Sequence, residues 1–258
     1  MTLPRRLAYI CAVLFLAFKV SATTVSFNPS VVGFPSGGGF LPGNASSVNV
    51  GGIQVDGFTV TGTIPTLSFT FTPAPLFGRN ESDDTGLGVC SAGESCSVPG
   101  GGDLNELSNE SKQELIRLTL PTGDSWTSVA LSSLDNNGGA TPERGVLVGD
   151  SATGLAAICE FGGSGGAGGP FTACSQIGGD GEEPIFAIPG TFANSQHIYF
   201  VPFDWLHNGA NKNNDFLVAG ASINPVPEPA SLILFGSGLA GLAGFAGIMR
   251  RRKGHFPQ

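Results

Sequence analysis

Cysteine is the residue type with the most specific chemistry in this 258-residue sequence. Cys11 lies in an apolar N-terminal stretch, and the other four are Cys90, Cys96, Cys159 and Cys174. Four cysteines allow three pairings, and we favour the two local ones, first with second and third with fourth, because each brackets a glycine- or serine-rich loop. The spacings do not fit a zinc site, and no histidine stands near a cysteine in sequence. We predict two disulfides, contributing about 2 and 3 kcal/mol by loop entropy.

Oxygen-bearing side chains form a second chemical candidate, a calcium site. Hard cations such as Ca²⁺ bind several carboxylate and amide oxygens from one or two loops. The candidate ligands are Asp135, Asn137, Asp204 and Asp215. Their spacing does not match an EF-hand loop, and the Asp-Asn-Asn-Gly sequence at 135–138 is equally typical of a turn. Calcium is the only cofactor that we consider.

Catalytic patterns are poorly supported. The glycine-rich stretch 162–166 matches a nucleophile elbow, but more glycines follow it instead of a helix. Likewise, 236–241 matches a dinucleotide fingerprint but lies inside an apolar run. His197 and His207 have no nucleophile paired with them by spacing. We therefore do not expect an enzyme. Trp205 lies in a polar stretch and is the aromatic residue that we select for stacking on a sugar, whereas most others are expected in a core.

The segment 226–253 combines three features in a fixed order. It opens with Val226, Pro227, Glu228 and Pro229, continues with 20 uncharged residues at 230–249, and closes with the basic residues Arg250, Arg251, Arg252 and Lys253. A helix of that length spans roughly the 30 Å of a bilayer core, and the basic cluster keeps 254–258 in the cytoplasm. The prolines cannot join the helix, so they present Glu228 on extended backbone, which suits a membrane peptidase.

These residues resemble the C-terminal sorting signal of the PEP-CTERM family of bacterial exported proteins. The resemblance implies that an exosortase, a membrane-embedded cysteine peptidase, reads the segment; the alternative is an uncut single-pass anchor. In the order of its motifs, the middle of the chain is also similar to ectodomains of that family, at 86–90, 114–118, 132–137, 143–145 and 215–220. The resemblance implies a β-sandwich ectodomain associated with exopolysaccharide or biofilm.

The N-terminal residues 1–22 have the pattern of a secretory signal peptide. Arg5 and Arg6 precede an apolar core, and a small-residue site predicts cleavage by signal peptidase between Ala22 and Thr23 after Sec export. Without both end segments, residues 23–225 carry five basic and 19 acidic residues, a net charge of −14. That charge argues against nucleic acid or anionic lipid as a partner.

Residues 23–225 are expected to form one all-β domain, a single β-sandwich that is jelly-roll-like. The reason is that short apolar runs alternate with turn residues and none has a sustained helical period. The strands are expected within 24–27, 47–50, 57–60, 68–71, 114–120, 125–131, 145–148, 155–161, 185–188, 197–201 and 215–223. The glycine-rich stretches 36–39 and 162–169 are expected to be flexible loops.

Together, these patterns predict an exported protein that passes through the inner membrane and reaches the cell surface or extracellular matrix. Its expected role is structural and not catalytic, in contact with extracellular polysaccharide. One alternative is a calcium-assisted carbohydrate-binding module. Another is a secreted glycosidase, which would need two carboxylates facing each other across a cleft.

Overall fold

The computed structural model describes residues 21–35, 38–63, 66–81, 84–94, 96, 106–108, 112–134, 143–162, 171–203, 215–225, 236–238 and 241–242. Residues Ala22–Asn224 form one compact unit, separate from the two end segments. The elements are β1 (Thr23–Ser26), α2 (Pro29–Val32), β2 (Gly38–Phe40), β3 (Ser47–Val50), β4 (Ile53–Thr63), β5 (Ser68–Pro73), β6 (Leu76–Asn80), β7 (Thr85–Val89), β8 (Gln113–Thr119), β9 (Ser125–Ser132), β10 (Arg144–Ser151), β11 (Gly154–Gly162), β12 (Gln176–Gly178), β13 (Ile185–Ala187), β14 (His197–Pro202) and β15 (Leu217–Asn224).

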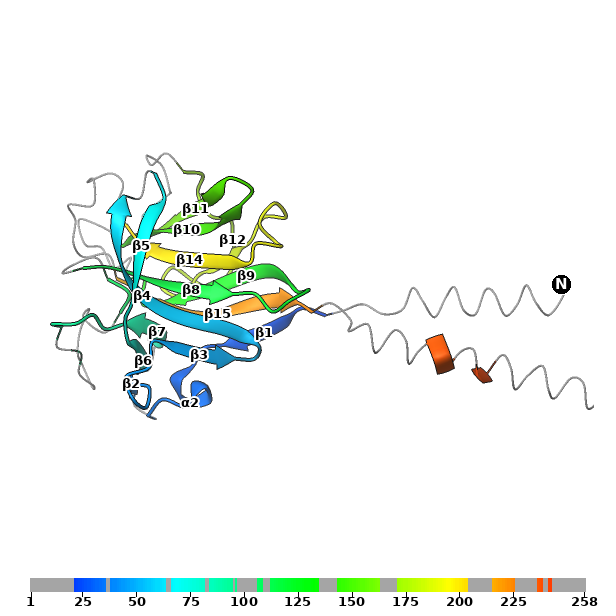
Figure 1. Ribbon diagram of the computed structural model, residues 1–258, viewed down its shortest axis with the longest axis horizontal. Coiled ribbons are helices and arrows are strands. Elements are labelled where there is room, and N and C mark those ends of the chain that lie inside the picture. The colour runs from blue at the N-terminus through cyan, green and yellow to red at the C-terminus, as the bar shows by residue number, and fades with distance from the viewer. Residues whose placement is uncertain are drawn as a thin grey trace, which may run out of the picture. The chain divides into compact units, whose positions relative to one another are not determined.

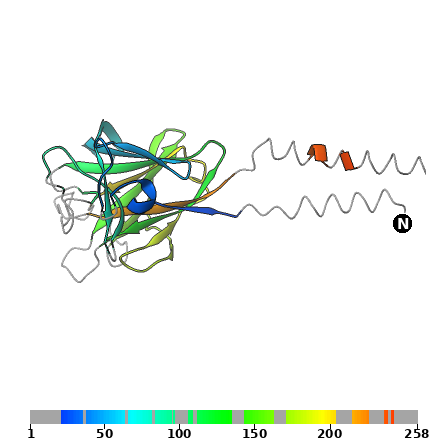
Figure 2. The same ribbon diagram turned by 90° about the horizontal axis from the view of Figure 1, so that it is seen from below.

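The strands form two antiparallel sheets, and the protein is an all-β sandwich (Figure 1). The eight-stranded sheet has the order β12-β13-β9-β15-β7-β6-β2, with β1 also paired to β15. The seven-stranded sheet has the order β11-β10-β14-β8-β4-β3, with β5 paired to β4. The first and last strands are neighbours, because Thr23 pairs with Ile223, and Figure 2 shows β1 beside β15. The domain therefore begins and ends at one place on the sandwich.

The core between the sheets contains large apolar side chains from both layers. Trp126, Phe200 and Phe216 are almost completely buried there. The indole Nε1 of Trp126 donates a hydrogen bond to the carbonyl of Ser195 at 2.8 Å, so burial of the ring leaves no polar atom unsatisfied. This confirms the expectation that aromatic residues at strand positions mainly supply the core.

The seven-stranded sheet carries apolar side chains on its outer face as well. In β8, Ile116 and Leu118 join the central core, whereas Leu115 belongs to a second apolar cluster with Val148 and Tyr199. Because side chains alternate along a strand, this second cluster lies on the opposite face of the sheet. Leu115 is fully buried on this outer face, which Arg117 shares.

Each expected strand range contains or overlaps an observed strand, but four strands were not predicted: β2, β6, β7 and β12. Glycine interrupts the apolar pattern of β6 and β7. Gly78 has a structural reason, since a Cβ there would lie 2.9 Å from Pro29, where α2 packs on the sheet. The prediction of a flexible loop at 36–39 is partly wrong, because Gly39 in β2 pairs with Gly78 in β6.

Gly162 ends β11 in a conformation that a side chain would oppose. Its φ is +86°, and a Cβ at this position would lie 1.9 Å from the Glu143 carbonyl oxygen. The glycine that suggested a nucleophile elbow is therefore explained by backbone geometry.

We expect Gly162→Ala to lower the free energy of unfolding by more than about 1 kcal/mol, because both φ and the close carbonyl oppose a Cβ. Gly190→Ala is the matched control, since a Cβ at Gly190 meets nothing within 4 Å. Urea unfolding of the two variants measures the difference. Equal stabilities would contradict this account of Gly162.

Candidate functional site

Two disulfides join the cysteines in the predicted pairs. Cys90 is bonded to Cys96 across 6 residues of sequence, and Cys159 to Cys174 across 15. Cys90 and Cys159 are both buried, at 5% and 4% exposure. The prediction of local pairing is confirmed: Cys90 directly follows β7, and Cys159 lies within β11.

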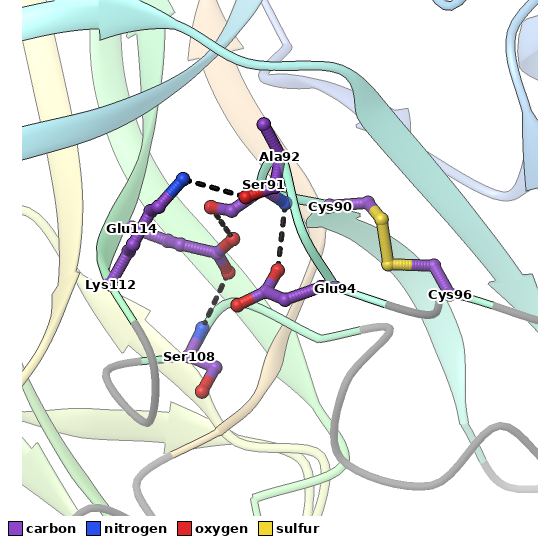
Figure 3. The surroundings of a disulfide bond; sticks show 8 residues. All are labelled: Cys90, Ser91, Ala92, Glu94, Cys96, Ser108, Lys112 and Glu114. Atoms are coloured by element: carbon purple, nitrogen blue, oxygen red, sulfur yellow. Dashed lines mark hydrogen bonds between the residues drawn. A yellow bond between two sulfur atoms is a disulfide. The ribbon is translucent and has the colours of Figure 1, made fainter.

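The first disulfide lies beside a buried glutamate that sequence reasoning did not select (Figure 3). Glu114, in β8, is fully buried. One carboxyl oxygen is hydrogen-bonded to the hydroxyl of Ser91, the residue after Cys90, and the other accepts the amide of Ser108 at 3.0 Å. Glu94 accepts the amide of Ser91 at 2.7 Å. The carboxyl of Glu114 therefore connects two loop segments that are distant in sequence.

The environment of Glu114 favours its neutral form. Burial, and to a smaller extent the negative charge of Glu94, raises its pKa from 4.5 to about 9, against the lowering effect of the Ser91 hydrogen bond. A carboxylic acid with this pKa has the proton affinity that a general acid needs. However, Glu114 is fully buried and both of its oxygens are hydrogen-bonded. The geometry therefore fits a structural carboxyl group.

A second acidic cluster surrounds Arg79 at one end of the eight-stranded sheet. Its guanidinium forms ion pairs with the buried Glu106, with Asp84 at 3.0 Å and with Glu81 at 3.2 Å. Burial raises the pKa of Glu106 well above its usual value, and the negative charge of Asp215 raises it further. Three carboxyl groups thus share one arginine.

Each of the three arginines in the sandwich pairs with the carboxylate of a buried residue. Arg79 pairs with Glu106, Arg117 with Asp56 at 2.8 Å, and Arg144 with Glu160 at 3.6 Å. Since an ionised carboxylate is costly to bury alone, these arginines are needed inside the fold.

A row of polar and aromatic side chains crosses the outer face of the seven-stranded sheet. Ser47, Asp56, Arg117 and Tyr199 occupy directly paired positions on β3, β4, β8 and β14. Arg117 donates two hydrogen bonds to Asp56, and its guanidinium carbon lies 4.9 Å from the ring centroid of Phe58. We call these four paired residues the outer row.

A histidine–aspartate pair adjoins the outer row. His197 presents both its main-chain amide and its ring Nδ1 to one oxygen of Asp150, each at 2.8 Å. An ionised carboxylate only accepts hydrogen bonds, so Nδ1 carries the hydrogen in this contact. The side chains of His197 and Asp150 are 28% and 33% exposed, so the pair is accessible to solvent.

Many of the residues selected from sequence lie outside the described part of the chain. These are Asp135, Asn137, Asp204, Trp205, Val226, Pro227, Glu228, Pro229, Arg250, Arg251, Arg252 and Lys253. Ala22 and Thr23, at the predicted signal cleavage, are exposed. Among the described residues, no helix has both the length and the apolar character needed to cross a membrane.

The structure gives limited support to a metal site. Asp215 is the one calcium candidate in the described residues; it is buried and near Glu106. Within the described part of the chain, one group of three side chains has metal-ligating atoms within 4.8 Å of one another: Cys90, Glu94 and Cys96. The two sulfurs of this group are bonded to each other in the disulfide. They are therefore not available as thiolate ligands.

Comparisons with known proteins give no match: no family model, no curated protein and no solved structure is similar to this chain.

Arg79→Ala should lower the free energy of unfolding by about 3 kcal/mol at pH 8, because Glu106 would keep a buried charge without its arginine. The loss should be smaller at pH 5. The pKa of Glu106 is raised above 4.5, so its neutral form stabilises the fold below that value and this stabilisation is lost as the pH rises. Urea unfolding at both pH values measures the effect.

The double variant Arg79→Ala, Glu106→Gln is the control for this measurement. The amide of glutamine carries no charge, so most of the lost stability should return. If the loss of stability is equal at both pH values and persists in the double variant, the Arg79–Glu106 ion pair is not the cause of that loss.

Proposed function

We propose that this chain is an exported surface or matrix protein with a structural, non-catalytic role, delivered by its C-terminal segment to an exosortase-type peptidase. The observation that supports this most directly is the extent of the compact unit, Ala22–Asn224. Its limits fall within two residues of the predicted signal cleavage at Ala22 and of the sorting motif that starts at Val226. The folded domain would therefore stay intact if both end segments were removed.

The two disulfides support export independently. Disulfides form and persist in oxidising compartments and are rare in the cytosol. Both bonds close loops on buried cysteines, as expected for structural bonds. A jelly-roll-like winding remains part of the proposal, since the chain passes repeatedly between the two sheets from β8 to β15.

The variant Pro227→Ala, Glu228→Ala, Pro229→Ala tests the sorting signal. We expect the wild-type chain to leave the membrane fraction of its native host, and the variant to accumulate there with the apolar run still attached. Pro225→Ala, a proline outside the triplet, is the matched control and should behave as wild type. If the triple variant is released as efficiently as the wild type, the triplet is not a processing signal.

The outer row supports a second candidate function, the binding of an uncharged polysaccharide. Asp56 and Arg117 neutralise each other, and the partly exposed Phe71 ring stacks on the buried Tyr199 ring, with 5.7 Å between the centroids. Fixed hydrogen-bonding groups beside aromatic rings are the usual means of recognising sugars, which offer hydroxyl groups and apolar faces. A polyanion is disfavoured as the ligand because residues 23–225 carry a net charge of −14.

A retention assay of the full chain tests this candidate. It uses the neutral polymers cellulose, xylan or mannan, with the polyanion alginate for comparison. Arg117→Ala should weaken retention on a neutral polymer about tenfold, through lost charged hydrogen bonds. Asp180→Ala, an exposed carboxylate between β12 and β13, is the control. If binding is assisted by calcium, a chelator should abolish retention. If binding needs no calcium, a chelator should leave retention unchanged. Equal retention of Arg117→Ala, or preference for alginate, would exclude the outer row as this site.

A further inference from the structure

A second row of polar side chains lies beside the outer row on the same face of the seven-stranded sheet. It consists of Gln54 in β4, Thr119 in β8 and His197 in β14, which occupy directly paired positions. Each of them stands two residues along its strand from a member of the outer row, so the two rows share one face and lie about 7 Å apart. We call these three residues the second row.

The outer row uses its charged groups within the protein. Asp56 accepts hydrogen bonds from the Ser47 hydroxyl and from Arg117, the latter at 2.8 Å. Gln54 of the second row joins this cluster, since its Nε2 donates to Asp56 at 3.1 Å. A carboxylate only accepts hydrogen bonds, so the amide nitrogen of Gln54 is the atom that faces Asp56, and the amide oxygen is not used in this contact.

Three polar atoms of the second row have no hydrogen-bond partner in the described part of the chain: Oε1 of Gln54, Oγ1 of Thr119 and Nε2 of His197. The Nδ1 hydrogen of His197 is donated to Asp150, which leaves Nε2 as the acceptor of the neutral ring. All three residues of the row are partly exposed. The second row therefore offers three neighbouring polar atoms to a ligand.

The sheet is curved toward this face, which brings aromatic rings beside the second row. The strands β5 and β14 are separated by β4 and β8, so in a flat sheet they would lie about 14 Å apart. Phe71 in β5 nevertheless stacks on Tyr199 in β14, with 5.7 Å between the ring centroids. The Tyr199 centroid in turn lies 6.0 Å from that of His197. The outer face is therefore concave here, with aromatic rings next to the free polar atoms.

The chemistry of the free atoms selects the class of ligand. An amide oxygen and an unprotonated ring nitrogen only accept hydrogen bonds, so the second row requires a ligand that is rich in donors. A sugar supplies donors through its hydroxyl groups and an apolar face for the aromatic rings. An anionic ligand would offer acceptors instead, and would meet Asp56, Asp150 and the net charge of −14 on residues 23–225. The match is to an uncharged polysaccharide.

We propose that the second row is a hydroxyl-binding subsite for an uncharged polysaccharide, in which Gln54, Thr119 and His197 each accept a hydrogen bond from one sugar hydroxyl. Asp150 is a positioning residue, because its bond to Nδ1 holds the histidine ring with Nε2 free. This inference rests on the second candidate function, the binding of an uncharged polysaccharide, and extends that site beyond the outer row.

Two substitutions that remove one free atom each test the subsite. Thr119→Val deletes the hydroxyl at nearly constant volume, and His197→Asn keeps a donor for Asp150 but lacks the Nε2 acceptor. Calorimetric titration of the full chain with cellohexaose, xylohexaose and mannohexaose measures binding. We expect each variant to bind the preferred hexasaccharide about fivefold more weakly, the effect of one lost hydrogen bond. Thr61→Val, an exposed threonine on the opposite face of β4, is the matched control and should bind as wild type.

A measurement on the wild-type chain keeps the test valid if a variant does not fold. The ring ¹⁵Nε2 signal of His197, followed by NMR at pH 8, should shift when the hexasaccharide saturates the site, because Nε2 gains a hydrogen bond. Wild-type affinity of either variant, or an unchanged Nε2 signal, would overturn the subsite; if Arg117→Ala still weakened binding, the candidate function would stand without it. Failure of the wild type to bind any of the three hexasaccharides would overturn both.

Discussion

The burial of carboxyl groups in a strongly acidic domain is the constraint on which the rest of the structure depends. An ionised carboxylate inside a protein costs several kcal/mol unless it is paired or loses its charge. The chain meets this cost in two ways. All three arginines of the sandwich pair with buried acids, and Glu114, surrounded by Ser91, Ser108 and Glu94, is instead held in its neutral form.

The two disulfides fit the same arrangement. Cys90 precedes Ser91, which contacts Glu114, and Cys159 precedes Glu160, whose main chain is hydrogen-bonded to Thr172 and Cys174. Each covalent bond therefore lies next to a buried acid. In this way, loops with few apolar residues are held against a core in which Trp126, Phe200 and Phe216 supply the burial.

The sequence was sufficient for the fold class and the cysteine pairs, because both depend on local signals. Apolar runs bounded by turn residues marked most strands, whereas glycines hid β6 and β7 by interrupting the apolar pattern. The pairing of arginines with acids could not be predicted, since Arg79 and Glu106 are 27 residues apart and Arg117 and Asp56 are 61 apart. Glu114 shares a strand face with Ile116 and Leu118, and only its burial and its bond to Ser91 mark it as a distinct site.

The central claim is that a disulfide-stapled sandwich is separated from both of its end segments on export. The most direct test is the intact mass of the protein recovered outside its native host, measured with and without thiol alkylation after denaturation. The account predicts a chain that starts near Thr23, ends near Pro227 and gains no mass on alkylation, because all four of its cysteines are paired. A chain that still carries Met249 and the basic cluster, or that takes up alkylating agent without reduction, would contradict it.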